Sequence, residues 1–276
     1  MVSTIQIKPA IQLQPFVSCY TLRKFNTADE TMPRPLHAVH ECYLTFFLRD
    51  KFFTVENEVT KELRFSSNVC TLFTESMGCA YFKGNFVLFC TQFKANGFSA
   101  VFGIPQKLII NAIHPVDDLL GNDSGLLTEQ FESSKNIAEM GDYMNAYLTK
   151  KLSEQHHKNY TNSIANVVDI ISRNKGVVSL DALTHHANMS FRNFERRFDD
   201  EVGMSPKLYS RITRFYNAME NKMMHPNKRW VDITNENGYF DQSHFIREVK
   251  AFSSKTPEEL FRNTPPPKEN FLVKVG

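Results

Sequence analysis

The chain has 276 residues, of which 42% are hydrophobic and 22% charged, and this composition excludes a disordered or collagen-like protein. It has no apolar run near the roughly 20 residues that span a membrane, and the first residues lack a secretory pattern, so we expect a cytoplasmic protein. Residues 1–159 carry 15 basic and 16 acidic side chains, whereas residues 160–263 carry 15 and 13. This asymmetry points toward a nucleic-acid partner at the C-terminal end, but it is too small to carry that inference alone.

The first half of the chain has the composition of β-strands. Aromatic and β-branched residues predict strands at 42–48, 52–55, 80–82 and 86–93. Lys83-Gly84-Asn85 lies between the last two segments and predicts a hairpin. Residues 97–105 then break the strand pattern. From about Ser124 the apolar residues fall at helical spacing and predict two helices, the second capped by Ser134.

The last hundred residues contain an internal repeat, with copies at 179–206 and 231–257. Asn188 and Gly238 stand at a turn position that tolerates a positive φ. Ser190 and Asp241 follow as expected N-caps of the next helix. The offset between the copies changes from 50 to 51 residues because the second turn holds one extra residue, Phe240.

Each copy predicts a helix-turn-helix unit whose second helix has one apolar and one polar face. The apolar faces carry Phe194, Phe198 and Val202, and Phe245, Val249 and Phe252. The opposite faces carry Arg192, Asn193, Glu195 and Arg196, and Gln242, Ser243, Ile246 and Arg247. Such a helix fits the major groove of DNA, where arginine pairs with guanine and glutamine with adenine. A connecting helix from Pro206 would hold the two units about one turn of DNA apart, roughly 34 Å.

Over residues 160–262 these motifs resemble transcription regulators of the AraC/XylS type. The first unit matches the family pattern at Ser190, Arg192, Phe194, Arg196, Phe198, Gly203, Ser205, Pro206, Tyr209, Arg214 and Ala218. The second matches at Ile233, Gly238, Tyr239, Asp241, Gln242, Ser243, His244, Phe245, Arg247, Lys250 and Pro257. The chain departs from the family at Thr184 and Thr234, where alanine is usual, at Ser254, where glycine is common, and at Val249, where phenylalanine is common. The N-terminal half lacks the sugar-binding pattern of the best-known members.

The resemblance also implies roles for individual residues. Base-reading positions would be Arg192, Glu195 and Arg196 in the first unit, and Gln242, Ser243, Ile246 and Arg247 in the second. Phosphate or flanking contacts would come from Asn193, Arg197, Lys250 and Thr256, and Ser190 would begin the first recognition helix.

We therefore expect an α+β protein in three parts. A β-rich domain with flanking helices at 1–155 would sense a signal or mediate dimerisation. An all-α domain at 160–263 would hold two helix-turn-helix units joined by a connecting helix, after a polar linker at 154–159. A tail at 264–276 would be flexible. Double-stranded DNA is the expected partner, and a small-molecule effector, a second copy of the chain and RNA polymerase are further candidates. We expect no membrane association, enzymatic activity, metal or cofactor.

Two alternatives concern the N-terminal half. His37, His40 and Glu41 suggest a metal-binding or enzymatic barrel with a DNA-binding appendage, although no further ligand stands at motif spacing. A regulator that works only through protein contacts would instead have a filled N-terminal core, with no cavity of about 300 Å³ or more. The five cysteines contain no CxxC pair, and we interpret Cys70, Cys79 and Cys90 as small buried hydrophobes in a reducing compartment.

Overall fold

The computed structural model describes residues 3–56, 59–62, 66–121, 123–155 and 162–263. Most of the predicted linker at 154–159, from residue 156 on, and all of the predicted tail at 264–276 lie outside these residues. Within the described ranges, no helix combines the length and apolarity needed to cross a membrane.

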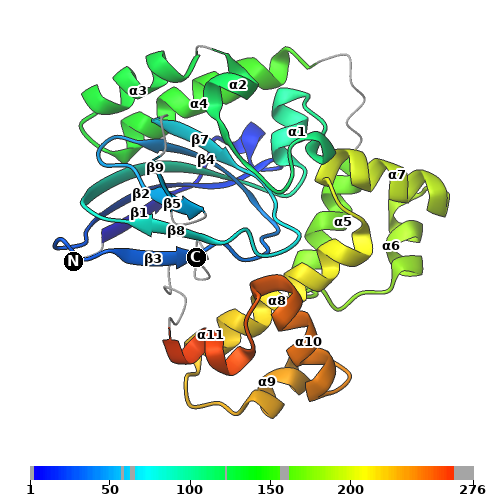
Figure 1. Cartoon of the computed structure of the whole chain (residues 1–276). Helices are drawn as coiled ribbons and strands as arrows, with labels where there is room; N and C mark the ends of the chain where they lie inside the picture. Colours follow the sequence, from blue (N-terminus) through cyan, green and yellow to red (C-terminus); the bar gives the residue numbers. More distant parts are fainter. Residues whose placement is uncertain (1–2, 57–58, 63–65, 122, 156–161, 264–276) are drawn as a thin grey trace.

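The N-terminal half forms two antiparallel sheets (Figure 1). The larger sheet has the order β1 (Ser3–Ile7), β2 (Val17–Asn26), β9 (Asn85–Phe93), β4 (Cys42–Phe47), β7 (Ser67–Cys70) and β10 (Ile113–Pro115). The smaller sheet has the order β3 (Met32–Pro35), β8 (Cys79–Phe82), β5 (Phe53–Glu56) and β6 (Val59–Glu62). The chain passes between the two sheets several times, and side chains of both sheets pack in one apolar cluster that includes Phe25, Phe47 and Phe82.

The hairpin predicted at Lys83-Gly84-Asn85 is wrong. β8 pairs with β3 and β5, whereas β9 pairs with β2 and β4, so the turn carries the chain from one sheet to the other. Gly84 makes this crossing with a φ of 130°, and its N–H donates to the Thr27 hydroxyl at 2.9 Å. Phe82 and Phe86 flank the turn and pack against each other between the sheets, with ring centroids 5.1 Å apart.

Two helices cover the other face of the larger sheet, namely α3 (Asp123–Ser133) and α4 (Ile137–Ser153) (Figure 1). The Phe131 ring lies 4.6 Å from that of Phe89 and 5.0 Å from that of Phe46. Asn136, not Ser134, caps α4 by accepting the Glu139 N–H at 3.1 Å. The Ser134 hydroxyl instead donates to the Gln130 carbonyl of α3.

Short helices connect these layers. They are η1 (Ile11–Leu13), α1 (Gly97–Phe102), η2 (Gln106–Leu108) and α2 (Val116–Leu120). The segment 97–105, which breaks the strand pattern in the sequence, is α1 and the turn after it.

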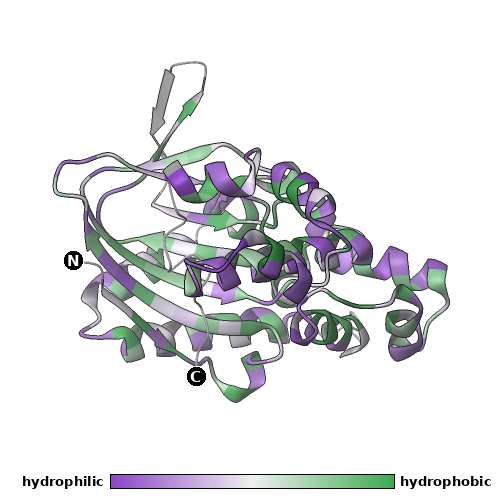
Figure 2. Ribbon diagram, turned by 90° about the horizontal axis from the view of Figure 1, so that it is seen from below, coloured by the Kyte–Doolittle hydropathy of each residue, from purple (hydrophilic) through white to green (hydrophobic). Residues whose placement is uncertain are grey.

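The C-terminal half is helical and is arranged along one connecting helix. Its elements are α5 (Asn162–Arg173), α6 (Leu180–Ala187), α7 (Phe191–Val202), α8 (Pro206–Met224), α9 (Trp230–Glu236), α10 (Gln242–Ser253) and α11 (Pro257–Asn263). α6 and α7 lie toward one end of α8, and α9, α10 and α11 lie toward the other (Figure 1). Apolar and polar segments alternate along these helices (Figure 2). The predicted α+β fold, with two helix-turn-helix units and a connector beginning at Pro206, is confirmed.

Both helix-turn-helix units contact the N-terminal half. In the first unit, Lys107 Nζ lies 2.5 Å from Asp200 Oδ1 near the C-terminal end of α7. In the second, the Ala38 N–H donates to the Phe252 carbonyl of α10 at 2.9 Å. Between them, the His40 ring packs edge-on against Tyr216 of α8 at 4.8 Å. The connector and both units therefore contact the N-terminal half through η2 and through the segment between β3 and β4.

Candidate nucleic-acid interface

The first unit turns between α6 and α7 at Asn188, which has a φ of 54° and ends α6 in the left-handed region. α7 then buries Phe194, Phe198 and Val202, as predicted from the sequence. Ser190 stands at the N-cap with extended backbone, but its side chain makes no capping hydrogen bond to any described residue. The position of the cap was therefore predicted, but its expected hydrogen bond is missing.

The outer face of α7 exposes Arg192, Glu195 and Arg196. The Arg196 guanidinium donates to Asn193 Oδ1 at 3.0 Å and to Asp200 Oδ2 at 3.4 Å, so two neighbours on the same helix hold it. Arg197 is different, because its guanidinium lies in a half-buried site 2.6 Å from Glu201 Oε1. Burial raises the pKa of Glu201, and the ion pair with Arg197 opposes that shift. This contact favours a structural role for Arg197.

The second unit turns at Gly238, which has a φ of 67°. Tyr239 is buried behind the turn, and Asp241 caps α10 by accepting the His244 N–H at 2.6 Å. α10 buries Phe245, Val249 and Phe252, as predicted.

The outer face of α10 exposes Gln242, Ser243, Arg247 and Lys250. Ile246 differs from these residues because it is half-buried. Part of its side chain packs against the hydrophobic core. The structure thus places an exposed polar surface on each recognition helix, and it sets Arg197 and Ile246 apart from the other predicted site residues.

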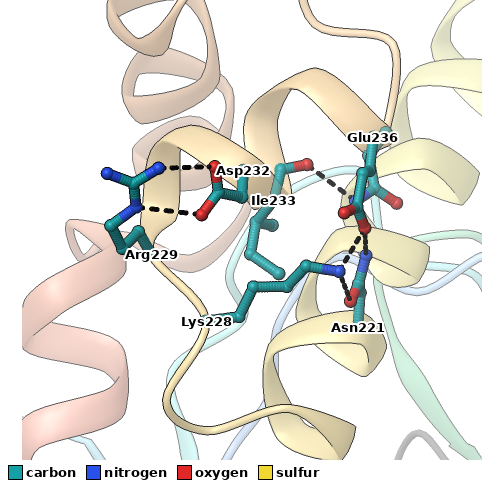
Figure 3. A network of polar contacts seen from close by, with 7 residues as sticks. Asn221, Lys228, Arg229, Asp232, Ile233 and Glu236 are labelled. Carbon is teal, nitrogen blue, oxygen red and sulfur yellow. Dashed lines mark hydrogen bonds and ion pairs between the residues drawn. The ribbon is translucent and has the colours of Figure 1, made fainter.

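A polar network ties the end of α9 to α8 and to the loop between them (Figure 3). Glu236 accepts hydrogen bonds from Lys228 and, at 3.0 Å, from Asn221. Arg229 donates twice to Asp232, at 3.0 and 3.1 Å. The contact with Lys228 lowers the pKa of Glu236, and the contact with Arg229 lowers that of Asp232. The bond between Asn221 and Glu236 joins α9 to the connector, whereas the bonds between Arg229 and Asp232 lie within the first turn of α9.

A buried carboxylate joins the connector to the second recognition helix. Glu248 of α10 is 3% exposed and accepts hydrogen bonds from Arg211 Nε at 2.6 Å and from Arg214 at 3.2 Å. His244 Nε2 lies 3.5 Å from the same carboxylate. Arg214 matches the family pattern, but the sequence does not indicate that Glu248 is its partner. Lys207, Arg211 and Arg247 line a groove between the two units beside this contact, which gives the space between them a basic wall.

Three of the four departures from the family pattern have local explanations. The hydroxyls of Thr184 and Thr234 donate to the carbonyls four residues earlier in their helices, at 2.9 and 2.8 Å, so neither leaves a buried donor unpaired. Ser254 has a φ of 59°, which explains why glycine is common at this position.

The N-terminal half contains a cavity of about 230 Å³ between the two sheets. Its apolar lining includes Phe47, Phe52 and Phe82, and its polar lining includes Arg23, Arg34 and His37. Tyr216 of α8 also lines it, so the cavity reaches the connector. His37 is 8% exposed, and neither of its ring nitrogens has a hydrogen-bond partner among the described residues.

The other histidine and the cysteines considered in this half have shifted pKa values. Burial lowers the pKa of His40 and raises the pKa of all five cysteine thiols. Cys70, Cys79 and Cys90 are only half-buried, less than predicted. Within the described residues, no three His, Cys, Asp or Glu side chains gather in a group that could hold a metal ion. His37, His40 and Glu41 therefore do not support the alternative of a metal-binding barrel.

Comparison with known proteins gives one sequence match. The helix-turn-helix domain family matches residues 183–263. No curated protein matches the chain. Among solved structures, ToxT from Vibrio cholerae O395 is similar over 89% of this chain and 97% of its own, with 10% identity and a TM-score of 0.45. An unsaturated-fatty-acid-bound ToxT from strain SCE256 covers 96% and 95%, with 9% identity and a TM-score of 0.45. The AraC-like activator CuxR covers 90% and 79%, with 9% identity and a TM-score of 0.17.

Proposed function

We propose that the chain is a DNA-binding transcription regulator whose residues 183–263 form an AraC-type helix-turn-helix domain. In this proposal, α7 and α10 enter two successive major-groove segments of one operator. Arg192, Glu195 and Arg196 read the first segment. Gln242, Ser243 and Arg247 read the second, and Ile246 contributes its exposed part. Asn193 and Lys250 contact phosphates or flanking positions.

One observation carries this proposal: two helices with exposed polar faces are tied to a single connecting helix. Arg214 of α8 and Glu248 of α10 hold the second unit, and α7 packs directly against α8. A rigid connector fixes the spacing between recognition helices, and operator half-sites one helical turn apart require such a spacing. The basic groove between the units lies where backbone phosphates would pass from one segment to the next.

A binding experiment tests the proposal. Duplexes are selected from a random library by the full-length protein, and the affinity for the selected duplex is measured against salt and against scrambled duplex. We expect a steep salt dependence and a clear preference for the selected sequence. Arg196→Ala and Arg247→Ala should each cost about 1–3 kcal/mol and relax the selected sequence in different half-sites.

Arg49→Ala is the matched control, because Arg49 is an exposed arginine of the N-terminal half and its loss changes the net charge equally. Equal affinity for selected and scrambled duplexes would contradict sequence-specific reading. Unchanged binding by both arginine variants would contradict the placement of the recognition helices.

We further propose that residues 1–155 sense a compact effector that occupies the cavity between the sheets, while residues 160–263 bind DNA. The cavity is smaller than ordinary ligand pockets, which start at about 300 Å³, so it suits a small molecule. Its mostly apolar lining favours a molecule with an apolar body. At the cavity wall, the two ring nitrogens of His37 have no hydrogen-bond partner among the described residues. A buried polar group without a partner costs free energy, so a ligand that bonds to His37 would gain affinity. Contact with Tyr216 gives the occupant a route to the DNA-binding units.

Thermal unfolding with a panel of small aromatic carboxylates and their neutral amides tests the effector proposal. A binder should raise the unfolding temperature of the wild-type protein and change its affinity for the selected duplex. Ala80→Phe, which fills the cavity from β8, should abolish both responses while leaving DNA binding without ligand intact. Homodimerisation and contact with RNA polymerase stay open predictions, to be tested by sedimentation and by reconstituted transcription.

A further inference from the structure

The most exposed large apolar side chain among the described residues is Phe240, in the turn of the second unit. It is 91% exposed, whereas most phenylalanines of the chain are buried. It stands immediately before Asp241, the N-cap of α10. A solitary exposed apolar residue is ordinary on a protein surface, so its position and its neighbours decide whether it has a use.

The fold itself does not need the Phe240 ring. A hydrophobic residue before an N-cap often packs on the fourth residue of the helix, which here is Phe245. Tyr239 already makes that contact, with its ring 5.0 Å from the Phe245 ring, and it is buried. Gly238 supplies the positive φ of the turn. Phe240 is therefore left outside a turn that its neighbours complete.

The first unit makes the equivalent turn with one residue fewer. There Asn188 is followed by Met189 and then directly by the N-cap Ser190. Phe240 is the extra residue that shifts the repeat offset from 50 to 51. A serine or lysine would fill such an exposed position without placing an aromatic ring in water. The exposed ring therefore suggests a binding partner that covers it.

The position of Phe240 in the fold indicates what this partner is. Gln242 and Ser243 begin the exposed face of α10, two and three residues further along the chain. The N-terminal part of a recognition helix is the part that meets base edges. The Phe240 ring therefore lies at the rim of the surface that the proposed function turns toward DNA.

The chemistry of the ring narrows the contact. Phenylalanine has no hydrogen-bonding group, so phosphate oxygens and the polar base edges offer it nothing. The C5-methyl group of thymine is the apolar feature of the major groove, and phenylalanine is among the side chains that contact it. We propose that Phe240 is a specificity-determining residue that packs against a thymine methyl at the edge of the half-site read by α10. This inference rests on the proposed function and adds a preference for thymine to it.

Removing single methyl groups from the DNA tests this contact. Full-length protein selects duplexes from a random library, and the half-site of α10 is the one whose selected sequence relaxes in Arg247→Ala. Each thymine of that half-site is then replaced in turn by deoxyuridine, which lacks only the methyl group. One replacement should weaken wild-type binding about three- to fivefold, as expected for the loss of one buried methyl.

Phe240→Ser should bind the unmodified duplex with the same loss and should not respond to the deoxyuridine replacement. Ile11→Ser is the matched control, because Ile11 is an apolar residue of the N-terminal half that is 83% exposed. It should keep the wild-type response. Thermal unfolding should be the same for all three proteins, since neither substitution touches the core, and Phe240→Leu should keep part of the methyl preference.

The possible failures are distinguishable. If the wild-type protein selects no sequence, the proposed function fails and this inference fails with it. If the wild-type protein selects a sequence but Phe240→Ser binds both duplexes as the wild-type protein does, the inference alone is overturned. Weaker binding of Phe240→Ser with an unchanged response to deoxyuridine also overturns the methyl contact. Unchanged DNA binding with lost activation of RNA polymerase would assign the ring to a protein partner and overturn it too.

Discussion

The guanidinium carbon of Arg214 lies 4.6 Å above the ring centre of Tyr239, so the connecting helix contacts the turn of the second helix-turn-helix unit. The same guanidinium donates to Glu248 at 3.2 Å. One arginine thus joins the connector to both the turn and the recognition helix. The orientation of α10 depends on α8 through this side chain.

Loss of Glu248 should destabilise the DNA-binding domain. Glu248→Ala leaves Arg214 half-buried beside an empty site, and removing one partner of a buried ion pair costs about 3 kcal/mol. We expect the free energy of unfolding, measured in urea, to fall by about that amount. Affinity for the selected duplex should fall as well, because α10 loses its tie to α8. Glu258→Ala removes an exposed partner of Arg262 and should change neither quantity measurably.

Ser254 should be replaceable by glycine with a gain in stability. Ser254 follows the last residue of α10 and has a φ of 59°. This left-handed backbone conformation costs a non-glycine residue about 1 kcal/mol. Ser254→Gly should therefore raise the free energy of unfolding by about that amount. Gly238→Ala should do the opposite, since φ is 67° and a Cβ would lie 2.7 Å from Val177. If both variants shift stability in the same direction, this explanation by backbone strain is wrong.

The helix-turn-helix units were predictable because their signals are local. Asn188, Gly238 and Asp241 each act within a few residues of their own turn, and the buried phenylalanines follow helical spacing. The partners of the strands are not encoded in this way. The turn at Gly84 suits a hairpin as well as a crossing between sheets, and the pairing of β8 with β3 depends on residues far along the chain.

Glu248 shows the same limit within the candidate site. In the sequence it is an ordinary acidic residue on a helix that also carries exposed polar side chains. Its burial depends on Arg211 and Arg214, which are 37 and 34 residues away. The likeness of the two repeats does not predict this contact, because the counterpart of Glu248 in the first repeat is Arg197, which pairs with Glu201 on its own helix.

Acidification should weaken the fold through His37. Burial, followed by the positive charge of Lys255, lowers its pKa from 6.5 to about 4. Below pH 6.5 the unfolded chain binds a proton that the folded protein does not accept until about pH 4, so stability is complete above pH 6.5 and falls as the pH decreases. A shift of this size corresponds to about 3 kcal/mol at the acid end of the window.

Urea unfolding between pH 7 and pH 4 measures this dependence. His37→Leu should flatten the curve, and a residual slope is expected from His40, whose pKa burial also lowers. His186→Gln, at an exposed position of α6, should leave the curve as it is in the wild-type protein. An unchanged slope in His37→Leu would show that this histidine does not titrate in the folded protein as expected.

Asp200 should restrain DNA binding, because it holds Arg196 on its own helix and also pairs with Lys107 of the N-terminal half. Asp200→Ala removes one of the two contacts that hold the Arg196 guanidinium, leaving the one with Asn193, and it removes a negative charge from the proposed DNA-facing helix. Exposed ion pairs of this kind are weak, so we expect affinity for the selected duplex to rise about two- to fivefold in a gel-shift titration.

Two variants separate the contributions of Asp200. Lys107→Ala breaks the same contact with the N-terminal half but leaves Arg196 paired, so any gain it gives comes from loosening that contact. In an Arg196→Ala background, Asp200→Ala should give a smaller gain, since residues that act through one contact are not additive. Asp142→Asn, at an exposed position of α4, controls for the change in net charge. An equal gain in Asp142→Asn would mean that charge alone, rather than loss of the contact between Asp200 and Arg196, controls the affinity.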